Sequence, residues 1–586
     1  MPRETLDSFR FGTEPIPHRM LRWHLYGAGL ENFGNEGKPE EVEVPQFSDN
    51  ELLVRQDACG LCFSDTKVIA LGNQHPRMTG RDLQRDPVTL GHEVACTVVG
   101  VGSSLKDRFN IGDRFVIQAD VFYQGTSMAY GYAIRGGLAE YSVIGAPIIN
   151  GDEGCYLLPL NKSTGYVESA LTEPWACVVS AYAQGHRTAF KPSGNLLVIL
   201  GTGAQLEDME WMIDAEKAPH SLVVVPFGAD AQADVLPATV RGVPVTLRAG
   251  AELATLRDHD VPAGFDDIVV LGGMDEGVLE TAATLLADHG IFNLKGAGKL
   301  ARPLTLDIGR IHYNWHYYLA DTGTSPQNLY LEPRAAELRS GGIAWLVGAG
   351  GPMGQMHVQR AIQLPNPPAC IVATDLDGVR LQSVVDRFGE MARKRGIKLV
   401  AVNPGLMDPQ LFDAMLRDLT SNHGFDDIVS LVPVAKVIEH AAQFLATGGW
   451  FNIFAGVARG TMAALDTNLI SLHGCRFLGS SGSSLADMRE TLSRVQSGAL
   501  STNTSLAAIG GMEAAREGLA AVKDGRFTGK TLIFPLIHDL PLMSLEQLKT
   551  ELPTVAAKLR DGMFWTTEAE EELLKLKLGG TVDAEA

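Results

Sequence analysis

The sequence predicts an α/β protein in which a β-rich module precedes two tandem copies of a doubly wound unit. Three observations lead to this prediction. The chain is rich in glycine, with 63 in 586 residues, and several of these glycines stand between apolar runs of strand and helix length. Short β-rich runs separated by turns fill residues 51–144. A long stretch between about 193 and 525 repeats itself.

Composition and charge exclude several classes of protein. The chain is long enough for about three or four domains, and its 45% hydrophobic and 20% charged residues are typical of globular proteins. A net charge of −20 repels phosphate backbones, so nucleic acid is not an expected partner. No run approaches the roughly 18 apolar residues of a membrane span, and no apolar signal segment opens the chain. Seven cysteines are too few for a disulfide scaffold, which predicts a reduced cytoplasmic protein.

The β-rich module is read from four short runs. These runs are Glu51-Leu-Leu-Val-Arg, Val94-Ala-Cys-Thr-Val-Val-Gly, Asp113-Arg-Phe-Val-Ile and Ala139-Glu-Tyr-Ser-Val-Ile. Gly-Asp at 112–113 and Gly-Gly at 136–137 are turn signals between them. Helical character follows from about 164 to 187.

The internal repeat is the most informative feature of the remaining chain. Gly264-Phe-Asp-Asp-Ile-Val269 recurs letter for letter as Gly424-Phe-Asp-Asp-Ile-Val429. Three further matches follow, all at one constant spacing that differs from that of the hexapeptide by a single position. They are Phe292-Asn293 with Phe451-Asn452, Leu306-Asp307 with Leu465-Asp466, and Leu319 to Ser325 with Leu478 to Ser484. Four matches in register predict two copies of one doubly wound nucleotide-binding unit.

We expect the following division of the chain. The β-rich domain covers 1–192 and is completed by 526–586, a return strand and a helical tail. The first doubly wound copy covers 193–335, the second covers 340–525, and the linker lies around 326–340.

A cluster of potential metal ligands lies in the β-rich module. Cys59-Gly-Leu-Cys62 is followed within the module by His92-Glu93, and Glu173 comes further along. Thiolate, imidazole and carboxylate are all zinc ligands, and three protein ligands with one open position are typical of catalytic zinc. Two buried thiols and a core histidine would give the same spacing. The adjoining Ser64-Asp65 favours a metal site, because a hydroxyl there can pass a proton and an aspartate can orient the histidine.

At this point the chain resembles the zinc-dependent medium-chain dehydrogenase/reductase superfamily, in its alcohol, polyol and threonine dehydrogenase branch. The resemblance covers nearly the whole chain apart from the extra repeat. It rests on these motifs: Ala58-Cys-Gly-Leu-Cys-Phe-Ser-Asp65, Leu90-Gly-His-Glu93, Gly136-Gly-Leu-Ala-Glu-Tyr141, Leu171-Thr-Glu-Pro174, the glycine turn at 348–354, and Thr528-Gly-Lys530. It implies a GroES-like β-rich catalytic domain joined to Rossmann-type domains, here two in tandem.

The resemblance also implies roles for individual residues. Cys62 and His92 are the expected zinc ligands, and Cys59 a neighbour that does not bind. Family members differ on whether the carboxylate ligand corresponds to Glu93 or to Glu173. Ser64 is the expected proton-relay hydroxyl, and Lys67 takes the place of a relay histidine unless it is a solvated surface lysine. Because residues 113–141 contain no cysteine, we expect one catalytic zinc and no structural zinc.

The second copy carries the expected dinucleotide site. A glycine-rich turn between a strand and a helix lets backbone N–H groups approach a pyrophosphate. The expected turn residues are Gly348, Gly350, Gly351, Pro352, Met353 and Gly354. Asp375 ends the next strand, where a carboxylate binds ribose hydroxyls and repels a 2′-phosphate, so NAD is favoured over NADP. Arg380 is expected on the adenine side.

The first copy lacks these signals. Its turn, Gly201-Thr-Gly203-Ala-Gln-Leu206, has leucine in place of the third glycine, and Glu207, Asp208 and Glu210 crowd the helix start. Acidic groups there repel phosphate. We therefore expect a copy that keeps the fold, binds no dinucleotide, and covers the cleft, shapes the substrate pocket or forms a subunit contact.

The expected reaction is hydride transfer between a polar secondary alcohol and NAD, the alcohol being a polyol, a sugar derivative or a hydroxy amino acid. Basic residues between the ligand segments are candidates for binding an anionic group on the substrate: His75, Arg77, Arg81 and Arg85. Two alternatives remain: a zinc-free quinone or enoyl reductase, and a non-catalytic dinucleotide-binding assembly protein. The resemblance implies a homo-oligomer, a dimer or tetramer formed by pairing sheets, which the second sheet in this chain would either imitate or block.

Overall fold

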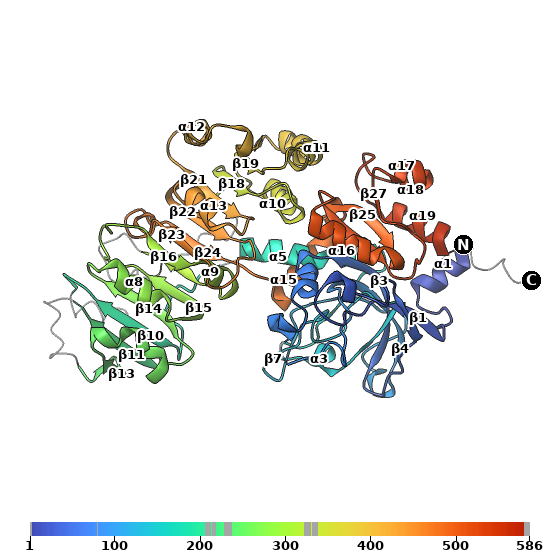
Figure 1. Cartoon of the computed structure of the whole chain (residues 1–586), viewed down its shortest axis with the longest axis horizontal. Helices are drawn as coiled ribbons and strands as arrows, with labels where there is room; N and C mark the ends of the chain where they lie inside the picture. The colour runs from blue at the N-terminus through green and yellow to red at the C-terminus, as the bar shows by residue number, and fades with distance from the viewer. Residues whose placement is uncertain are drawn as a thin grey trace, which may run out of the picture. The chain divides into compact units, whose positions relative to one another are not determined.

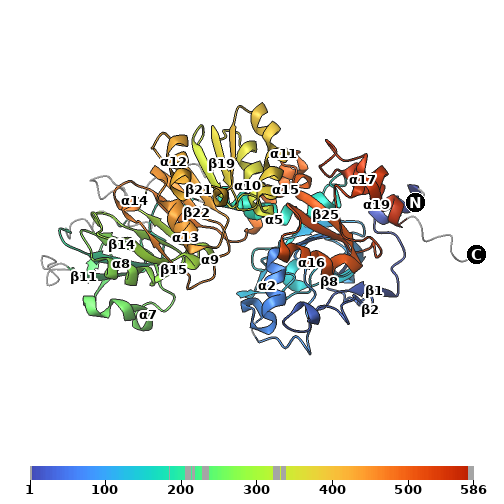
Figure 2. The same cartoon turned by 45° about the horizontal axis from the view of Figure 1, so that its top comes forward.

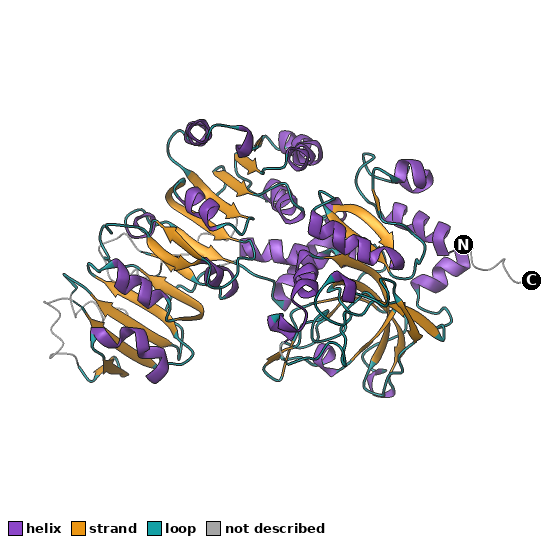
Figure 3. Ribbon diagram, in the orientation of Figure 1, coloured by secondary structure: helices purple, strands orange, loops and turns teal. Residues whose placement is uncertain are grey.

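The structure is a computed structural model of the whole chain, and its α/β architecture confirms the predicted fold class (Figure 3). It describes all residues except 1–2, 79, 184, 205–212, 214–217, 228–236, 321–329, 331–337 and 579–586. The described part divides into two compact units. One contains residues 1–179, 351–356 and 482–586, and the other contains 180–350 and 357–481. No helix among the described residues has the length and apolar character needed to cross a membrane.

The first unit is built on an eight-stranded sheet, as far as its residues are described. The strand order is β27-β25-β26-β3-β4-β5-β9, with β8 also paired to β3. The strands are β3 (Leu52–Leu61), β4 (Glu93–Val101), β5 (Arg114–Ile117), β8 (Tyr141–Ile144), β9 (Leu157–Pro159), β25 (Leu506–Gly511), β26 (Lys530–Phe534) and β27 (Met543–Ser544). Short pairs accompany them: β1 (Arg19–Arg22) with β2 (Glu40–Glu43), and β6 (Phe122–Tyr123) with β7 (Thr126–Ser127).

Helices surround this sheet. They are α1 (Arg3–Arg10), α2 (Phe63–Leu71), α3 (Ala146–Ile149), α4 (Tyr166–Ala170), α5 (Thr172–Ala183), α15 (Leu485–Gln496), α16 (Ala515–Asp524), α17 (Leu548–Glu551), α18 (Pro553–Ala556) and α19 (Thr567–Leu578). Every residue of β3 is buried, because α4 packs on β3 and α16 packs on β26 beside it. The expected second doubly wound domain ended at 525. In the structure β25 instead lies beside β26 in parallel and joins the sheet of the first unit.

The second unit contains one sheet of thirteen described strands. Its first half has the order β13-β11-β10-β14-β15-β17, with β12 at the outer edge, and its second half has the mirrored order β24-β22-β21-β18-β19-β20. Within each half these six strands are parallel, in the 3-2-1-4-5-6 order of a dinucleotide-binding fold. Figures 1 and 2 show the two halves as one row of strands.

The elements of the first half are β10 (Asn195–Leu200), β11 (Ser221–Pro226), β12 (Thr239–Val240), β13 (Val243–Leu247), α7 (Leu256–His259), β14 (Phe265–Leu271), α8 (Glu276–Ala283), β15 (Leu286–Asn293), β16 (Leu304–Asp307), α9 (Ile308–Tyr313) and β17 (Tyr317–Leu319). Those of the second half are β18 (Ile343–Val347), α10 (Pro352–Gln363), β19 (Cys370–Thr374), α11 (Gly378–Lys394), β20 (Lys398–Val402), α12 (Pro409–Leu419), β21 (Phe425–Ser430), α13 (Ala435–Ala442), β22 (Leu445–Ile453), β23 (Met462–Leu465), α14 (Asn468–Ser471) and β24 (Arg476–Gly479).

The repeated hexapeptide has a structural reason in each half. Gly264 and Gly424 have φ of 89° and 85°, and a Cβ on either would lie within 2.7 Å of neighbouring backbone. The aspartates then tie the fourth strand to the first. Asp266 accepts a hydrogen bond from the Asn195 amide, and Asp426 accepts one from the Ile343 amide, both at 2.9 Å. The same letters recur because both halves use the same turn and the same strand-to-strand clamp.

Candidate functional site

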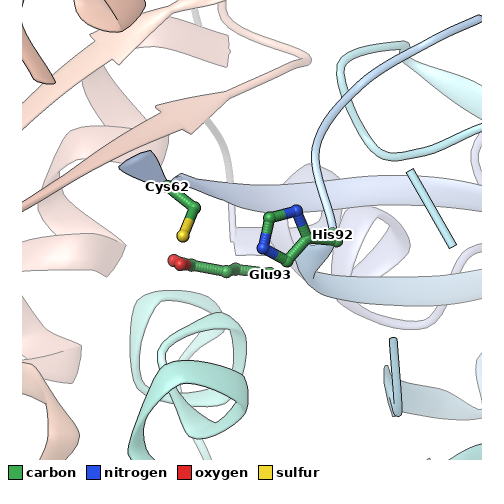
Figure 4. Close-up of side chains that lie close together, drawn as sticks. All are labelled: Cys62, His92 and Glu93. Carbon is green, nitrogen blue, oxygen red and sulfur yellow. The ribbon is translucent and has the colours of Figure 1, made fainter. Parts of the chain in front are cut away.

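Three of the predicted zinc ligands meet in the first unit. The Cys62 thiol, a His92 ring nitrogen and a Glu93 carboxylate oxygen lie within 4.8 Å of one another (Figure 4). The side chains of His92 and Glu93 are buried, and Cys62 is half-buried. A thiol, an imidazole and a carboxylate at this separation form a donor set suited to zinc.

Two neighbouring strands bring these residues together. Cys62 follows the last residue of β3 and is the N-cap residue of α2, in extended backbone. Glu93 is the first residue of β4, which pairs antiparallel with β3 so that Glu93 faces Gly60. A Cβ on Gly60 would lie 2.2 Å from a Glu93 carboxylate oxygen, so only glycine leaves room for that side chain.

Asp65 organises the cluster from behind. One oxygen of its carboxylate lies 3.1 Å from Nδ1 of His92, and the other accepts a hydrogen bond of 2.9 Å from the Cys62 amide. Asp65 is completely buried, and its contact with Nδ1 leaves the second ring nitrogen, Nε2, to face the thiol and the carboxylate. A carboxylate behind a histidine is the usual way in which a metal-binding imidazole is oriented.

Glu93 is held by a residue that sequence reasoning assigned no role. Nζ of Lys530, at the start of β26, donates to one Glu93 oxygen at 2.5 Å and to the Leu61 carbonyl at 3.0 Å. The second Glu93 oxygen, Oε2, is buried without a hydrogen-bond partner. A buried carboxylate oxygen without a partner is costly unless a cation completes its environment. The residues present therefore fit a zinc ion at Cys62, His92 and Glu93.

The first cysteine of the Cys-x-x-Cys motif lies apart from this cluster. Cys59 is fully buried in β3, with its sulfur 3.6 Å from the Gly60 carbonyl oxygen, and burial raises the pKa of its thiol. Gly91 has a φ of 93°, and a Cβ there would lie 2.5 Å from the Cys59 sulfur. The Cys59 thiol therefore packs against Gly91, the residue that precedes His92.

Glu173 lies near the cluster but is not one of its three members. It stands in the first turn of α5 and is buried. Burial raises the pKa of its carboxyl to about 7, with Glu93 and Asp120 adding to the rise and His92 opposing it. Glu173 is thus close enough for the charges of His92 and Glu93 to act on it, and the choice between Glu93 and Glu173 stays a prediction.

The two candidate relay residues stand on α2. Oγ of Ser64 lies 3.4 Å from Nε2 of His92, on the side of the ring that faces the thiol. Lys67 lies one turn further along, with Nζ 5.9 Å from the centre of the Phe63 ring, and is half-buried. Positions three apart on a helix share a face, so Lys67 stands on the same side of α2 as Ser64.

The basic residues of the loop between the ligand segments differ in their surroundings. Arg81 holds the loop, Arg85 is solvated, and Arg77 lies near the cluster. Arg81 bonds to the carbonyls of Tyr132 and Ala133, and the side chain of Arg85 is 90% exposed. Arg77 instead lies 5.1 Å above the ring of Tyr132, which itself lies 5.5 Å from the His92 ring. Arg77 also forms a 2.7 Å ion pair with Asp120.

The predicted dinucleotide turn follows β18. Gly348 has a φ of 82°, and a Cβ on Gly350 would lie 2.7 Å from Cβ of Arg380 and 2.8 Å from a carboxylate oxygen of Asp375. Asp375 accepts a hydrogen bond of 2.9 Å from the Gly350 amide. The structure therefore brings Gly348, Gly350, Asp375 and Arg380 together. Pro352, Met353 and Gly354 form the start of α10, directly after Gly351.

The turn of the first copy is hydrogen-bonded through its backbone to the loop that follows β14. Thr202 and Gly273 exchange two hydrogen bonds of 2.9 Å, and a Cβ on Gly201 would lie 2.2 Å from the Gly273 carbonyl oxygen. The Thr202 amide is therefore bonded within the chain, as is the corresponding Ala349 amide of the second copy, which bonds to the Thr374 carbonyl oxygen at 2.9 Å. The acidic residues expected at the helix start, Glu207, Asp208 and Glu210, lie outside the described residues, as does Leu206.

Comparison with known proteins points to one family. Residues 48–149 match the model of the alcohol dehydrogenase GroES-like domain. Mannitol-1-phosphate 5-dehydrogenase of Aliivibrio fischeri is 26% identical over 548 residues, which cover 91% of this chain and 93% of that protein. L-sorbose 1-phosphate reductase of Klebsiella pneumoniae is 27% identical over 50% of this chain and 73% of its own. Sorbitol dehydrogenase of Bacillus subtilis is 29% identical over 33% of this chain and 51% of its own.

Proposed function

Because this chain belongs to the zinc-type medium-chain alcohol and polyol dehydrogenase superfamily, we propose that it transfers hydride between a secondary alcohol and NAD with one catalytic zinc ion. The observation that carries the proposal is the cluster of Cys62, His92 and Glu93, with its unpartnered carboxylate oxygen. Zinc bound there would act as a Lewis acid that lowers the pKa of the substrate hydroxyl.

Oxidation of an alcohol removes a hydride from carbon and a proton from oxygen. The hydride chemistry belongs to the nicotinamide, so the task of the protein is to accept the proton. We propose that the Ser64 hydroxyl receives it, and its distance of 3.4 Å from His92 Nε2 supports this role. Lys67, on the same face of α2, is proposed to pass it towards solvent.

The second doubly wound copy is the proposed NAD site. The turn at Gly348 and Gly350 would let the backbone approach a pyrophosphate, and the Asp375 carboxylate would disfavour the 2′-phosphate of NADP. Arg380 stands in the first turn of α11 and pairs with Asp377. Three large apolar side chains nearby are exposed: Leu376 (73%) after β19, Val379 (76%) in the first turn of α11, and Leu406 (83%) after β20. An adenine ring bound there would cover them.

A polyol that carries a phosphate is the proposed substrate class. The relative from Aliivibrio fischeri is named for a polyol phosphate, and the one from Klebsiella pneumoniae is named for a sugar phosphate. Arg77 is the residue of this chain that suits the phosphate, since guanidinium groups bind phosphate oxygens in pairs and Arg77 stands beside Tyr132, which in turn lies beside His92.

All cysteines of the chain carry free thiols, which is compatible with the proposed cytoplasmic location.

The zinc assignment is tested with a matched pair of cysteine variants. Cys62→Ser should lose zinc, measured by mass spectrometry of the metal, and lose turnover of NAD with a polyol panel. Cys59→Ala should keep about one zinc per chain. Full activity of Cys62→Ser, or activity in protein without zinc, would favour a zinc-free quinone or enoyl reductase. Binding of NADH without turnover of any alcohol would favour a non-catalytic assembly protein.

The substrate class is tested separately with arginine variants. Arg77→Met should raise KM at least 10-fold for a polyol phosphate and leave a neutral polyol unchanged, because one charge-assisted contact is worth about 1.4 kcal/mol or more. Arg85→Met, in the same loop but solvated, should change neither. Equal use of neutral and phosphorylated polyols by the native protein would reject the phosphate and leave the dehydrogenase proposal intact.

A further inference from the structure

The two copies in the second unit meet edge to edge, and each copy uses its sixth strand for this contact. β17 of the first copy pairs with β24 of the second, and this is an antiparallel pairing between two otherwise parallel halves. The paired residues are Tyr318 and Phe477. They directly precede Leu319 and Leu478, which match in the sequence repeat, so each residue faces its own counterpart.

A second pair of strands follows the same rule. β16 pairs antiparallel with β23, and Thr305 faces Ala464. These two are again counterparts, because they directly precede the matching Leu-Asp pairs of the repeat. Glu280 accepts a hydrogen bond of 2.7 Å from the Thr305 amide, and Glu439 accepts one of 2.9 Å from the Ala464 amide, so the supporting contacts are duplicated too. Both strand pairs therefore lie across one approximate two-fold axis.

The core runs through this seam without interruption. Phe292 stacks on Tyr318 at 5.4 Å, and their counterparts Phe451 and Phe477 lie 5.9 Å apart. All four rings are at most 2% exposed and belong to one hydrophobic cluster that includes side chains of both copies. An apolar, fully buried seam is typical of permanent interfaces between subunits.

The symmetry decides what kind of interface this is. If the tandem copies contacted each other head to tail, the contact would join two different faces, and one face of each kind would remain exposed. A two-fold interface is self-complementary and closed, as in a symmetric dimer. We infer that the first copy is an internal partner subunit. It occupies the sheet edge through which another chain would pair, so that a single chain is the complete working assembly.

One departure from symmetry fits this role. A Cβ on Gly479, at the end of β24, would lie 2.5 Å from the Ile311 carbonyl oxygen in α9 of the first copy. The counterpart of Gly479 is Ala320, which does carry a Cβ. The second copy is thus shaped for the α9 of the first. In this inference the first copy is kept as a partner, in place of the homo-oligomer that the resemblance implied.

The mass of the native protein in solution tests the inference without any need for turnover. Light scattering after gel filtration, from about 1 to 100 μM, should give the 63.0 kDa of one chain at every concentration. A mass of two or four chains, or a mass that rises with concentration, would overturn the inference.

A cysteine pair tests whether the seam closes within one chain. Thr305 and Ala464 are exposed and directly opposed, so Thr305→Cys with Ala464→Cys should form a disulfide when diamide takes up the two electrons and protons. The product should migrate as a single chain on a non-reducing gel. The single variant Thr305→Cys should give no linked chains. Linked dimers from either variant would show that the edges pair between chains and would refute the proposal.

Discussion

The ion pair between Lys530 and Glu93 is the residue-scale feature on which the site depends most. Both side chains are almost completely buried, and the neighbouring Glu93 and Cys62 raise the pKa of Lys530 against the effect of its burial. Removing one partner of such a pair leaves a buried charge without compensation. Lys530→Met should therefore lower the free energy of unfolding by about 3–5 kcal/mol, measured by urea denaturation.

An exposed ion pair provides the control for that measurement. Lys549 and Glu546 lie 2.7 Å apart with side chains 49% and 78% exposed. Lys549→Met should change the free energy of unfolding by less than about 1 kcal/mol. If both lysine variants behaved alike, Lys530 would not be holding Glu93 in place.

Asp65 allows the contact behind the histidine to be tested apart from the ligands. Asp65→Asn keeps the size of the side chain but removes the charge that faces Nδ1 of His92. Affinity for zinc should fall about 10- to 100-fold, measured by competition with a chromogenic chelator. Unchanged affinity would mean that His92 is oriented without the help of the Asp65 charge.

At this scale the sequence predicts the cluster of Cys62, His92 and Glu93 better than its surroundings. The short spacings in Cys59–Cys62 and His92–Glu93 lie within single loops and strand ends, so local pattern reveals them. Lys530 is far from Glu93 in the chain and meets it only because β26 pairs with β3. Its signal was a lone lysine at the head of the buried apolar strand Lys530-Thr-Leu-Ile-Phe534, where an unpaired charge is not tolerated.

At the scale of elements, the C-terminal helix α19 caps a helix far away in the sequence. The Glu570 carboxylate accepts hydrogen bonds from the amides of Tyr166 and Val167, at 2.7 and 2.8 Å, at the start of α4. Glu570→Ala should lower the free energy of unfolding by about 2–3 kcal/mol, because two buried amides lose a charged acceptor. Glu568→Ala, on the same helix but less buried, should have little effect. Equal effects in thermal or urea unfolding would reject the cap.

The segment after β26 is tied to the start of β8 by a contact that depends on pH. His538 lies 2.7 Å from Glu140, and this hydrogen bond is the main reason that the pKa of His538 is raised. A raised pKa in the folded protein stabilises it below the unfolded value of about 6.5, and the gain is lost as pH rises through the folded pKa. His538 is half-exposed, so the gain is under about 1 kcal/mol.

Unfolding of His538→Gln at two pH values checks this contact. The free energy of unfolding of the native protein should exceed that of the variant at pH 6, and the difference should shrink by pH 9. A difference that stays constant or grows with pH would contradict the assignment.

Elements were predictable where the pattern is local. The apolar runs that became β10 and β18, with their glycine turns, and the repeated hexapeptide at β14 and β21 all appear where expected. β25 was not separable from the second copy by sequence, because a buried parallel strand reads the same in either sheet. The pairing of β25 with β26 shows that β25 belongs to the sheet of the first unit. Such a pairing cannot be inferred from the sequence of either strand alone.

For the whole molecule, the repeat predicted two copies but not how they meet. The pairing of Tyr318 with Phe477 depends on the shape of two complete sheet edges, whereas the repeat shows only which residues recur. The structure adds that the copies share one sheet and one core. The described residues contain one cluster of potential zinc ligands and one glycine turn of the dinucleotide-binding type, which agrees with the inference that the chain is a single enzyme with an internal partner.

The most direct test of the central claim is X-ray absorption at the zinc edge of the purified protein. The account predicts one zinc per chain with one sulfur neighbour at about 2.3 Å, from Cys62, and nitrogen or oxygen neighbours at about 2.0–2.2 Å from His92, a carboxylate and solvent. Two or more sulfur neighbours, or active protein that contains no zinc, would contradict it.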